Sequence, residues 1–107
     1  MAKPQTHADQ ARLVDEVYAL TLEIDTAVKL SDWQRAARLA RERSPMVHAI
    51  APVQSASALE LIRSIQTLDA ARLATLRAAR VQLSAEYQQA KASVGAARQY
   101  QKMARLF

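Results

Sequence analysis

The stretch SALELIRSIQTLDAARLATLRAARVQLSAEYQQAKASV, residues 57–94, contains neither glycine nor proline. Its large apolar side chains recur every three or four residues, which is the period of one face of an α-helix. It opens with Ser57-Ala-Leu-Glu60, a pattern in which the serine caps the first N–H groups and the glutamate reaches back. The sequence therefore predicts one long helix over about 57–94, and an all-α fold.

The same capping pattern occurs twice earlier in the chain, each time before a helical apolar period. Thr6-His-Ala-Asp9 predicts the start of a helix over about 8–30, and Ser31-Asp-Trp-Gln34 predicts the start of a helix over about 32–50. Pro45 lacks an N–H and clashes with the preceding turn, so we expect the second helix to kink there or to restart with Ser44 as its cap.

The first of these helices carries two apolar rows, of which the stronger is expected to face the core. The main row consists of Leu13, Val17, Leu20, Ile24, Ala27 and Val28. The second row consists of Val14, Tyr18 and Leu22. A second row needs a second neighbour, or it leaves an apolar face partly exposed.

The chain's single glycine, Gly95, separates the long helix from the last segment, AARQYQKMARLF. In that segment Tyr100, Met103 and Phe107 form an apolar edge, which predicts a short amphipathic helix over about 96–106. This tail either folds back and competes with a partner for apolar surface, or continues the third helix. The expected architecture is a single domain over 1–107: an antiparallel bundle of three helices with a long third helix and a short C-terminal fourth helix or extension.

Trp33, the only tryptophan, is expected to fill the end of the bundle where the first two helices meet. Aromatic residues make up 5% of the chain, and a tryptophan buries a large apolar area in such a thin core.

The net charge of +5 is unevenly distributed. Residues 1–32 hold three basic and six acidic residues, whereas residues 70–107 hold seven basic residues and one acidic residue. A basic end of this kind meets nucleic acid, an anionic membrane or an acidic partner, or it complements the chain's own acidic first segment.

The sequence contains no motif of the kind that catalysis or metal binding requires. There is no cysteine, His7 and His48 lack the short spacing of a metal pair, and one glycine cannot form a phosphate-binding loop. The acidic residues of the first helix, among them Glu23 and Asp25, are expected on a solvated face. We therefore expect a protein that is not an enzyme and needs no cofactor or metal. With no signal peptide or membrane-length apolar run, it is expected in the cytoplasm without membrane insertion.

Four arginines in the second helix, Arg35, Arg38, Arg41 and Arg43, make nucleic acid a candidate partner. Arg43 points away from the other three around the helix, and no helix-turn-helix glycine or interleaved aromatic residue accompanies them. A basic nucleic-acid-binding protein and a coiled-coil adaptor without chaperone activity both remain open alternatives.

The order of these elements carries a resemblance to a known family. Asp32-Trp33 opens the second helix, RAARLARERSPMVHAI follows, and the long basic helix contains Leu68-Asp69 and repeated Ala-Arg steps before the late Tyr100. Over about Leu13–Tyr100 the chain resembles the FliT family of flagellar export chaperones.

This resemblance implies a small cytoplasmic chaperone that binds the C-terminal segment of the flagellar filament-cap protein before secretion. It also implies contacts with the export ATPase and its soluble export factors and, in some bacteria, with a flagellar transcription activator. A C-terminal helix that covers part of the binding surface belongs to the same expectation, and a homodimer is compatible with it.

Such a chaperone needs apolar surface that accepts an amphipathic partner helix. Leu39, Met46 and Ile50 are left over once the main rows are assigned, and Met suits an adaptable binding surface. Together with Leu61 and Leu68, they are the predicted partner-binding residues. The alternative is that these residues pack against a dimer partner or against the third helix.

Overall fold

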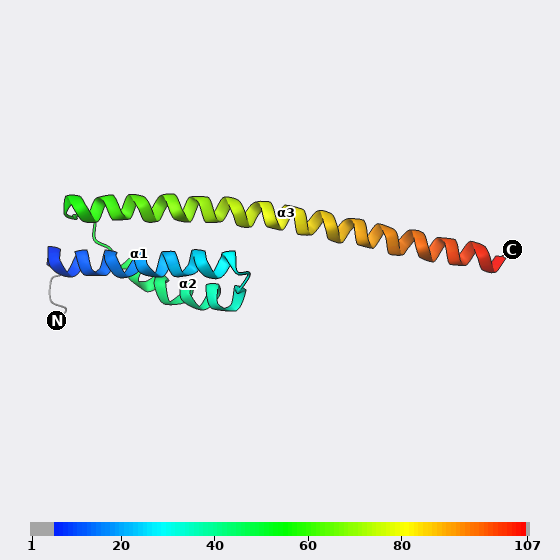
Figure 1. Ribbon diagram of the computed structural model, residues 1–107, viewed down its shortest axis with the longest axis horizontal. Helices are drawn as coiled ribbons and strands as arrows, with labels where there is room; N and C mark the ends of the chain where they lie inside the picture. Colours follow the sequence, from blue (N-terminus) through cyan, green and yellow to red (C-terminus); the bar gives the residue numbers. More distant parts are fainter. Residues whose placement is uncertain (1–5, 107) are drawn as a thin grey trace. The chain divides into compact units, whose positions relative to one another are not determined.

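The computed structural model describes residues 6–106, and the side chains of residues 100 and 106 fall outside that description. Over the described residues the chain forms three helices: α1 (His7–Lys29), α2 (Trp33–His48) and α3 (Ala56–Leu106) (Figure 1). No strand occurs in this part of the chain. The prediction of an all-α fold with a long third helix is confirmed.

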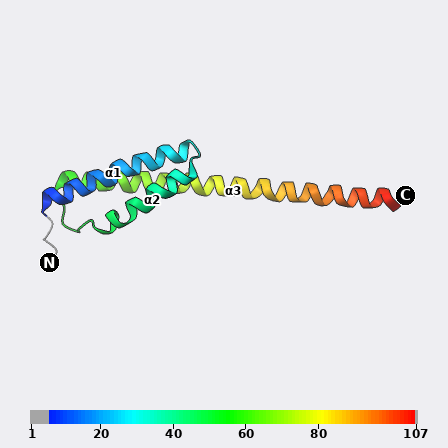
Figure 2. The same cartoon turned by 90° about the horizontal axis from the view of Figure 1, so that it is seen from below.

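The chain divides into two compact units, Met1–Arg72 and Leu73–Phe107. In the first unit α1 and α2 run antiparallel, and the first part of α3 lies beside them in both ribbon views (Figures 1 and 2). The second unit is the remainder of α3. The single domain over 1–107 stays a prediction.

The start of α1 has the predicted capping box. The Thr6 hydroxyl accepts a hydrogen bond from the Asp9 N–H at 3.1 Å, and the Asp9 carboxylate accepts one from the Thr6 N–H at 3.2 Å. The backbone hydrogen bond from Thr6, followed by the bond to its side chain, lowers the pKa of Asp9. Two N–H groups that the helix cannot pair are thereby satisfied.

The turn between α1 and α2 differs from the predicted Ser31 cap. The Ser31 N–H donates to the Val28 carbonyl at 3.0 Å and the Asp32 N–H to the Ala27 carbonyl at 2.8 Å, which is the Schellman ending of a helix. Ser31 takes the left-handed conformation that this ending requires, with φ of 56°. Asp32 therefore caps α2 instead, its carboxylate accepting from the Arg35 N–H at 3.3 Å.

The predicted cap of the third helix is also displaced by two residues. Ser55, and not Ser57, accepts the hydrogen bond from the Ala58 N–H, at 3.2 Å. The loop before it is fixed by Gln10 on α1, whose amide oxygen accepts from the Ala51 N–H at 2.9 Å and from the Gln54 side chain at 2.7 Å. This buried glutamine thus sets where the chain re-enters the bundle and where α3 begins.

The expected restart of the second helix at Ser44 does not occur, and at Gly95 the chain follows the alternative of a continuous third helix. Pro45 lies inside α2 on its exposed side, where water can satisfy the carbonyl that the missing N–H leaves unpaired. α3 runs through Gly95 without a break, so the predicted fourth helix over 96–106 is the end of α3. An isolated glycine weakens a helix by about 1 kcal/mol, which the long helical sequence around it tolerates.

The core of the first unit lies between α1 and the first part of α3. Val14, Val17, Ala58 and Ile65 form this core cluster. Val17, Ile24 and Ala27 of the predicted main row are buried, but its other three members are only partly buried. The buried row of α1 passes instead through Gln10, Val14 and Thr21. These two polar side chains can be buried because both have hydrogen-bond partners. The Thr21 hydroxyl, for example, donates to the Val17 carbonyl at 2.7 Å.

The prediction of a buried Trp33 is wrong, because its side chain is 53% exposed. Trp33 is the first residue of α2, and the turn before it is closed by backbone hydrogen bonds that need no side chain. The buried residues of α2 are Ala36 and Leu39, one and two turns further along the helix.

Candidate functional site

The five predicted partner-binding residues all lie in the first unit, and most of them contribute to its core. Leu39 is 5% exposed, and Met46, Ile50 and Leu61 pack against the core cluster. The premise that these side chains are left over from the core is therefore wrong. Whether they bind a partner stays a prediction. Leu68 differs from the other four in that it lines a groove at the surface.

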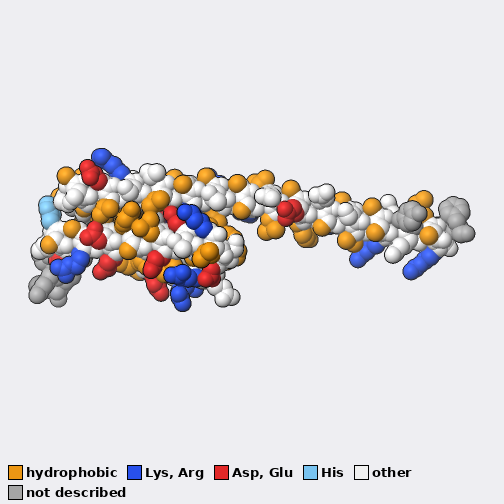
Figure 3. Space-filling model, viewed as in Figure 1, with side chains coloured by type: hydrophobic (Ala, Val, Ile, Leu, Met, Phe, Trp, Pro, Cys, Tyr) orange, Lys and Arg blue, Asp and Glu red, His pale blue; other side chains and the backbone are white. Residues whose placement is uncertain are grey.

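Leu68 is half-buried and lines a shallow groove between α1 and α3. Tyr18 forms the wall on α1, and the α3 side is completed by Arg63, Ser64 and Thr67. Leu22, one turn beyond Tyr18, is exposed. The second row of α1 thus has the accessible apolar edge that the sequence predicted for it, except at Val14, which is fully buried. Figure 3 shows hydrophobic side chains gathered between the two helices in this unit.

A polar network that the sequence analysis missed joins all three helices beside this core. Arg43 of α2 donates to the Thr21 hydroxyl of α1 at 2.9 Å and to the Asp69 carboxylate of α3 at 2.8 Å. Arg72 donates to Asp25 of α1 at 2.5 Å and also to Asp69. These four charged side chains are between 12% and 34% exposed.

The expectation that Asp25 lies on a solvated face is accordingly wrong. Its side chain is 17% exposed and forms an ion pair with Arg72. Two signals in the sequence pointed to this network: Arg43 diverges from the other arginines of α2, and Asp69 stands three residues before Arg72 on one helix face. Neither signal identifies the partners on α1.

The network also sets the protonation behaviour of Asp69. Partial burial alone would raise its pKa, but the hydrogen bonds from Arg43 and Arg72 outweigh that effect and lower the pKa below the ordinary value of 3.8. The Asp69 carboxylate is therefore ionised at neutral pH and holds two arginines, one from α2 and one from its own helix.

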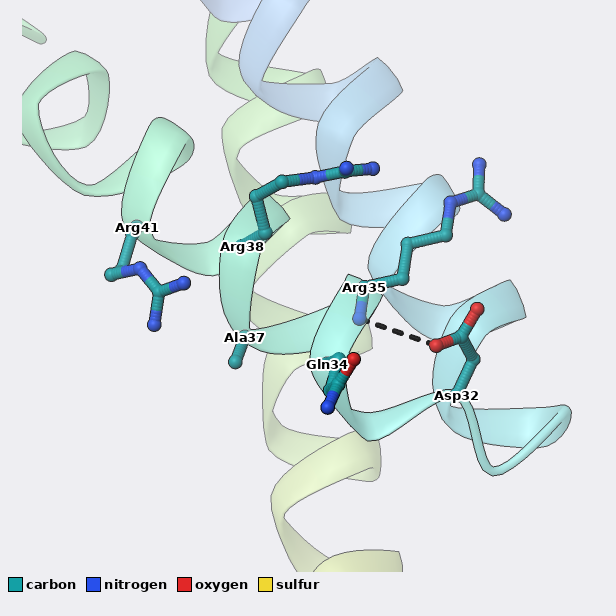
Figure 4. A pocket seen from close by; sticks show the side chains of 6 residues that line it. All are labelled: Asp32, Gln34, Arg35, Ala37, Arg38 and Arg41. Atoms are coloured by element: carbon teal, nitrogen blue, oxygen red, sulfur yellow. Dashed lines mark hydrogen bonds between the residues drawn. The ribbon is translucent and has the colours of Figure 1, made fainter.

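The remaining arginines of α2 form a basic surface with a shallow hollow in it. The residues that line this hollow are Asp32, Gln34, Arg35, Ala37, Arg38 and Arg41. In Figure 4 the side chains of Arg35 and Arg38 extend toward the same side, and Arg41 lies apart from them. Because Arg43 is taken up by the network, three of the four arginines remain for this surface.

The second unit exposes several large apolar side chains along α3, Tyr87, Val94 and Met103 among them. Of the predicted tail residues, Tyr100 lies in α3 but its side chain is outside the description, and Phe107 lies outside the described residues. The regulatory role of these three residues stays a prediction.

Among the described residues no three His, Cys, Asp or Glu side chains gather where they could hold a metal ion. Within the same part of the chain, none of the helices combines the length and the apolar character needed to cross a membrane.

Comparison with known proteins gives one family and no individual relative. Neither the curated proteins nor the solved structures contain a match. The model of one family, described as flagellar protein FliT, matches residues 11–102, which include the groove and the polar network. The chain therefore belongs to the FliT family of flagellar proteins.

Proposed function

We propose that this protein binds the C-terminal segment of the flagellar filament-cap protein as an amphipathic helix and delivers it to the export ATPase and its soluble export factors. Membership of the FliT family implies a flagellar export chaperone, a role without catalysis. The observation that carries the finer proposal is the groove between α1 and α3. It offers apolar walls, Tyr18 and Leu68, with Arg63 at its side.

In this proposal the client first binds in the groove and afterwards contacts the more deeply buried residues. Leu68 lines the groove, whereas Leu39 is buried and the partly buried Met46, Ile50 and Leu61 pack against the core cluster. We propose that a shift of α2 exposes these four residues further. Among the described residues α2 buries only Ala36 and Leu39. The apolar area that α2 buries is small, so the cost of displacing α2 by a client helix is set largely by the hydrogen bonds of Arg43 to Thr21 and Asp69.

The experiment measures binding of a peptide that carries the C-terminal segment of the cap protein, by calorimetry with the full chain. Leu68→Gln should weaken binding about tenfold or more, since it places an amide against the apolar side of the client. Leu59→Gln is the matched control: Leu59 is also a partly exposed leucine of α3, but nine residues away it lies on the opposite side of the helix.

Helicity and the unfolding midpoint of both variants are measured in parallel. Equal binding by folded Leu68→Gln and wild type would contradict the groove. Aspartate at Met46 and Ile50 is a poorer test, because both residues pack against the core cluster and a charge there unfolds the bundle.

A further inference from the structure

The second unit carries an apolar row on α3 that has no neighbour within that unit. Its members follow the spacing of three and four residues that places side chains on one helix face. We call this row the unit-2 seam, and it consists of Leu73, Leu76, Leu83, Tyr87, Ala90, Val94 and Ala97. Four of its large members are exposed, from 48% for Leu73 to 67% for Leu83, whereas Leu76 is half-buried. Side chains spaced in this way are typical of a helix that packs against another helix.

The seam is flanked on one side by positive charge. Arg77, Lys91, Arg98 and Arg105 are separated by seven or fourteen residues, so they share one edge of the helix beside the seam. Arg80 stands within the row itself, between Leu76 and Leu83. The unit holds six basic residues against one acidic residue, Glu86.

A hollow lies at the C-terminal end of the seam. The residues that line it are Tyr87, Ala90, Lys91, Val94, Gly95 and Arg98. A side chain added at Gly95 would meet nothing within 4 Å. Apolar surface, two cations and free space are thus combined at one place, which suits a large partner side chain next to a carboxylate.

We propose that the unit-2 seam binds an acidic amphipathic helix of another protein. The apolar face of that helix lies on the seam, its carboxylates face the basic edge and Arg80, and one of its larger side chains occupies the hollow beside Gly95. The site is separate from the groove of the first unit and does not depend on the client proposed for it.

Charge decides between this occupant and a second copy of the chain. In a pair of seams Arg80 and the basic edge of one copy would add to the same positive charge on the other, and like charges in contact disfavour association. An acidic helix gains attraction at every one of these positions. Two features favour a helix over nucleic acid: the row is apolar, and its one aromatic side chain, Tyr87, offers no series of stacking platforms.

The probe is a synthetic peptide of four seven-residue repeats, with Leu at the first and fourth positions of each repeat and Glu at the flanking positions. Its binding to the full chain is followed by fluorescence anisotropy. Replacing Leu83 and Tyr87 together with Gln should weaken binding about tenfold or more, since both contribute apolar area at the centre of the seam. Val81→Gln is the matched control, because Val81 is 69% exposed but lies off the seam.

The charge is tested with a second pair of variants. Replacing Lys91 and Arg98 with Glu should abolish most of the binding, whereas Gln89→Glu should change it less than about threefold, because Gln89 is exposed and lies on the opposite side of the helix from Arg98. A peptide with Lys in place of Glu should not bind. Loss of binding to the same extent in Val81→Gln or Gln89→Glu would overturn the proposal, because it would show that the peptide is attracted to the whole helix and not to the seam.

Two further outcomes would also overturn it. Sedimentation equilibrium of the wild type that shows a dimer lost in the Leu83/Tyr87 variant would assign the seam to a second copy. Duplex DNA or phosphatidylglycerol vesicles that displace the acidic peptide, and that lose affinity in the Lys91/Arg98 variant alone, would assign the surface to phosphate groups.

Discussion

Ser31 shows how a single backbone angle determines the junction between α1 and α2. Its φ of 56° lies in the left-handed region, which disfavours side chains because the Cβ comes close to the following carbonyl oxygen. The Schellman hydrogen bonds around it require that angle, and glycine is the residue that meets it without strain. The chain therefore accepts local strain at Ser31 in order to turn directly into the cap at Asp32.

Ser31→Gly should stabilise the protein by about 0.5–1 kcal/mol, because relief of the strain exceeds the added freedom of the unfolded chain. Urea unfolding followed by circular dichroism measures the change. Ser57→Gly, inside the first turn of α3, is the control and should destabilise by a similar amount. A loss of stability in Ser31→Gly would contradict the assigned turn.

Trp33 is a large apolar residue of the kind that usually fills a core, but as the first residue of α2 it is exposed. Apolar periodicity placed it in the same row as Ala36, but the first residue of a helix projects beyond the end of the packed surface. Trp33→Ala should consequently cost less than about 1 kcal/mol, compared with about 3–5 kcal/mol for a buried tryptophan. The loss of stability in Trp33→Ala and in Leu39→Ala is measured by thermal unfolding of the two variants. The leucine is buried and should cost about 2–4 kcal/mol, so a larger loss at Trp33 would refute this reading of the structure.

At the scale of elements, α2 is held by ionic contacts as much as by apolar ones. Arg43 reaches both other helices, through Thr21 and Asp69, so its removal leaves a partly buried carboxylate with one arginine fewer. Arg43→Ala should destabilise by about 1–3 kcal/mol, less than a fully buried pair because Asp69 keeps some solvent contact. Urea unfolding is the measurement, and Arg38→Ala, on the exposed side of α2, should stay within about 0.5 kcal/mol of wild type.

The same network predicts a dependence of stability on pH. The pKa of Asp69 is lower in the folded protein than the ordinary value of 3.8, so the unfolded chain binds the proton more readily. The stability that Asp69 contributes is therefore complete above about pH 4 and is lost as the pH falls through the folded pKa. Asp69→Asn should flatten this acidic part of the profile, in urea midpoints taken between pH 7 and pH 3. Asp15→Asn, on the exposed side of α1, serves as the control and should leave that part unchanged.

The helices could be predicted from the sequence to within two residues at most ends, because period and caps are local properties. The capping box at Thr6 is an example, since both of its partners lie within four residues. What could not be predicted depends on contacts across the bundle. The buried row of α1 includes Gln10, whose partners Ala51 and Gln54 are more than forty residues away in the chain, and no local pattern reveals such a partner.

The sequence predicted less of the candidate site than of the helices. Leu68 lines the groove together with Tyr18, a member of the predicted second row of the first helix, and its role in binding a partner stays a prediction. The assumption that the core does not use Leu39 was wrong, because apolar periodicity alone does not tell which face of a short helix is covered. The covered face depends on contacts between helices, such as the hydrogen bond from Arg43 to Asp69, whose partners are 26 residues apart in the chain.

At the scale of the whole molecule, the charge is divided between two compact units that differ in kind. The first has a core and an ionic network, and the second is a basic helix with an apolar seam. The two proposals made above together assign one binding surface to each unit. It follows that Leu68→Gln should weaken binding of the client alone and Leu83→Gln binding of the acidic peptide alone, and that a variant with both changes should show each loss unchanged.

The last prediction concerns the tail, residues 96–107, and its proposed regulatory role. We propose that Tyr100, Met103 and Phe107 limit client binding by competing for apolar surface, which requires α3 to open at Gly95. Docking of a few such side chains is worth a few kcal/mol at most, so a client displaces them by a shift of population. Deletion of 96–107 should therefore tighten client binding in calorimetry.

Gly95→Ala tests the same idea without removing any contact. The added methyl meets nothing within 4 Å and stabilises the helix by about 1 kcal/mol, which disfavours opening about fivefold. Client binding should then tighten up to fivefold, whereas Ala92→Gly, three residues earlier on the exposed helix, should facilitate opening and weaken binding. If deletion leaves the affinity equal or lower, the tail is a spacer or belongs to the client site. If deletion tightens binding but Gly95→Ala does not, the tail competes without any opening at Gly95.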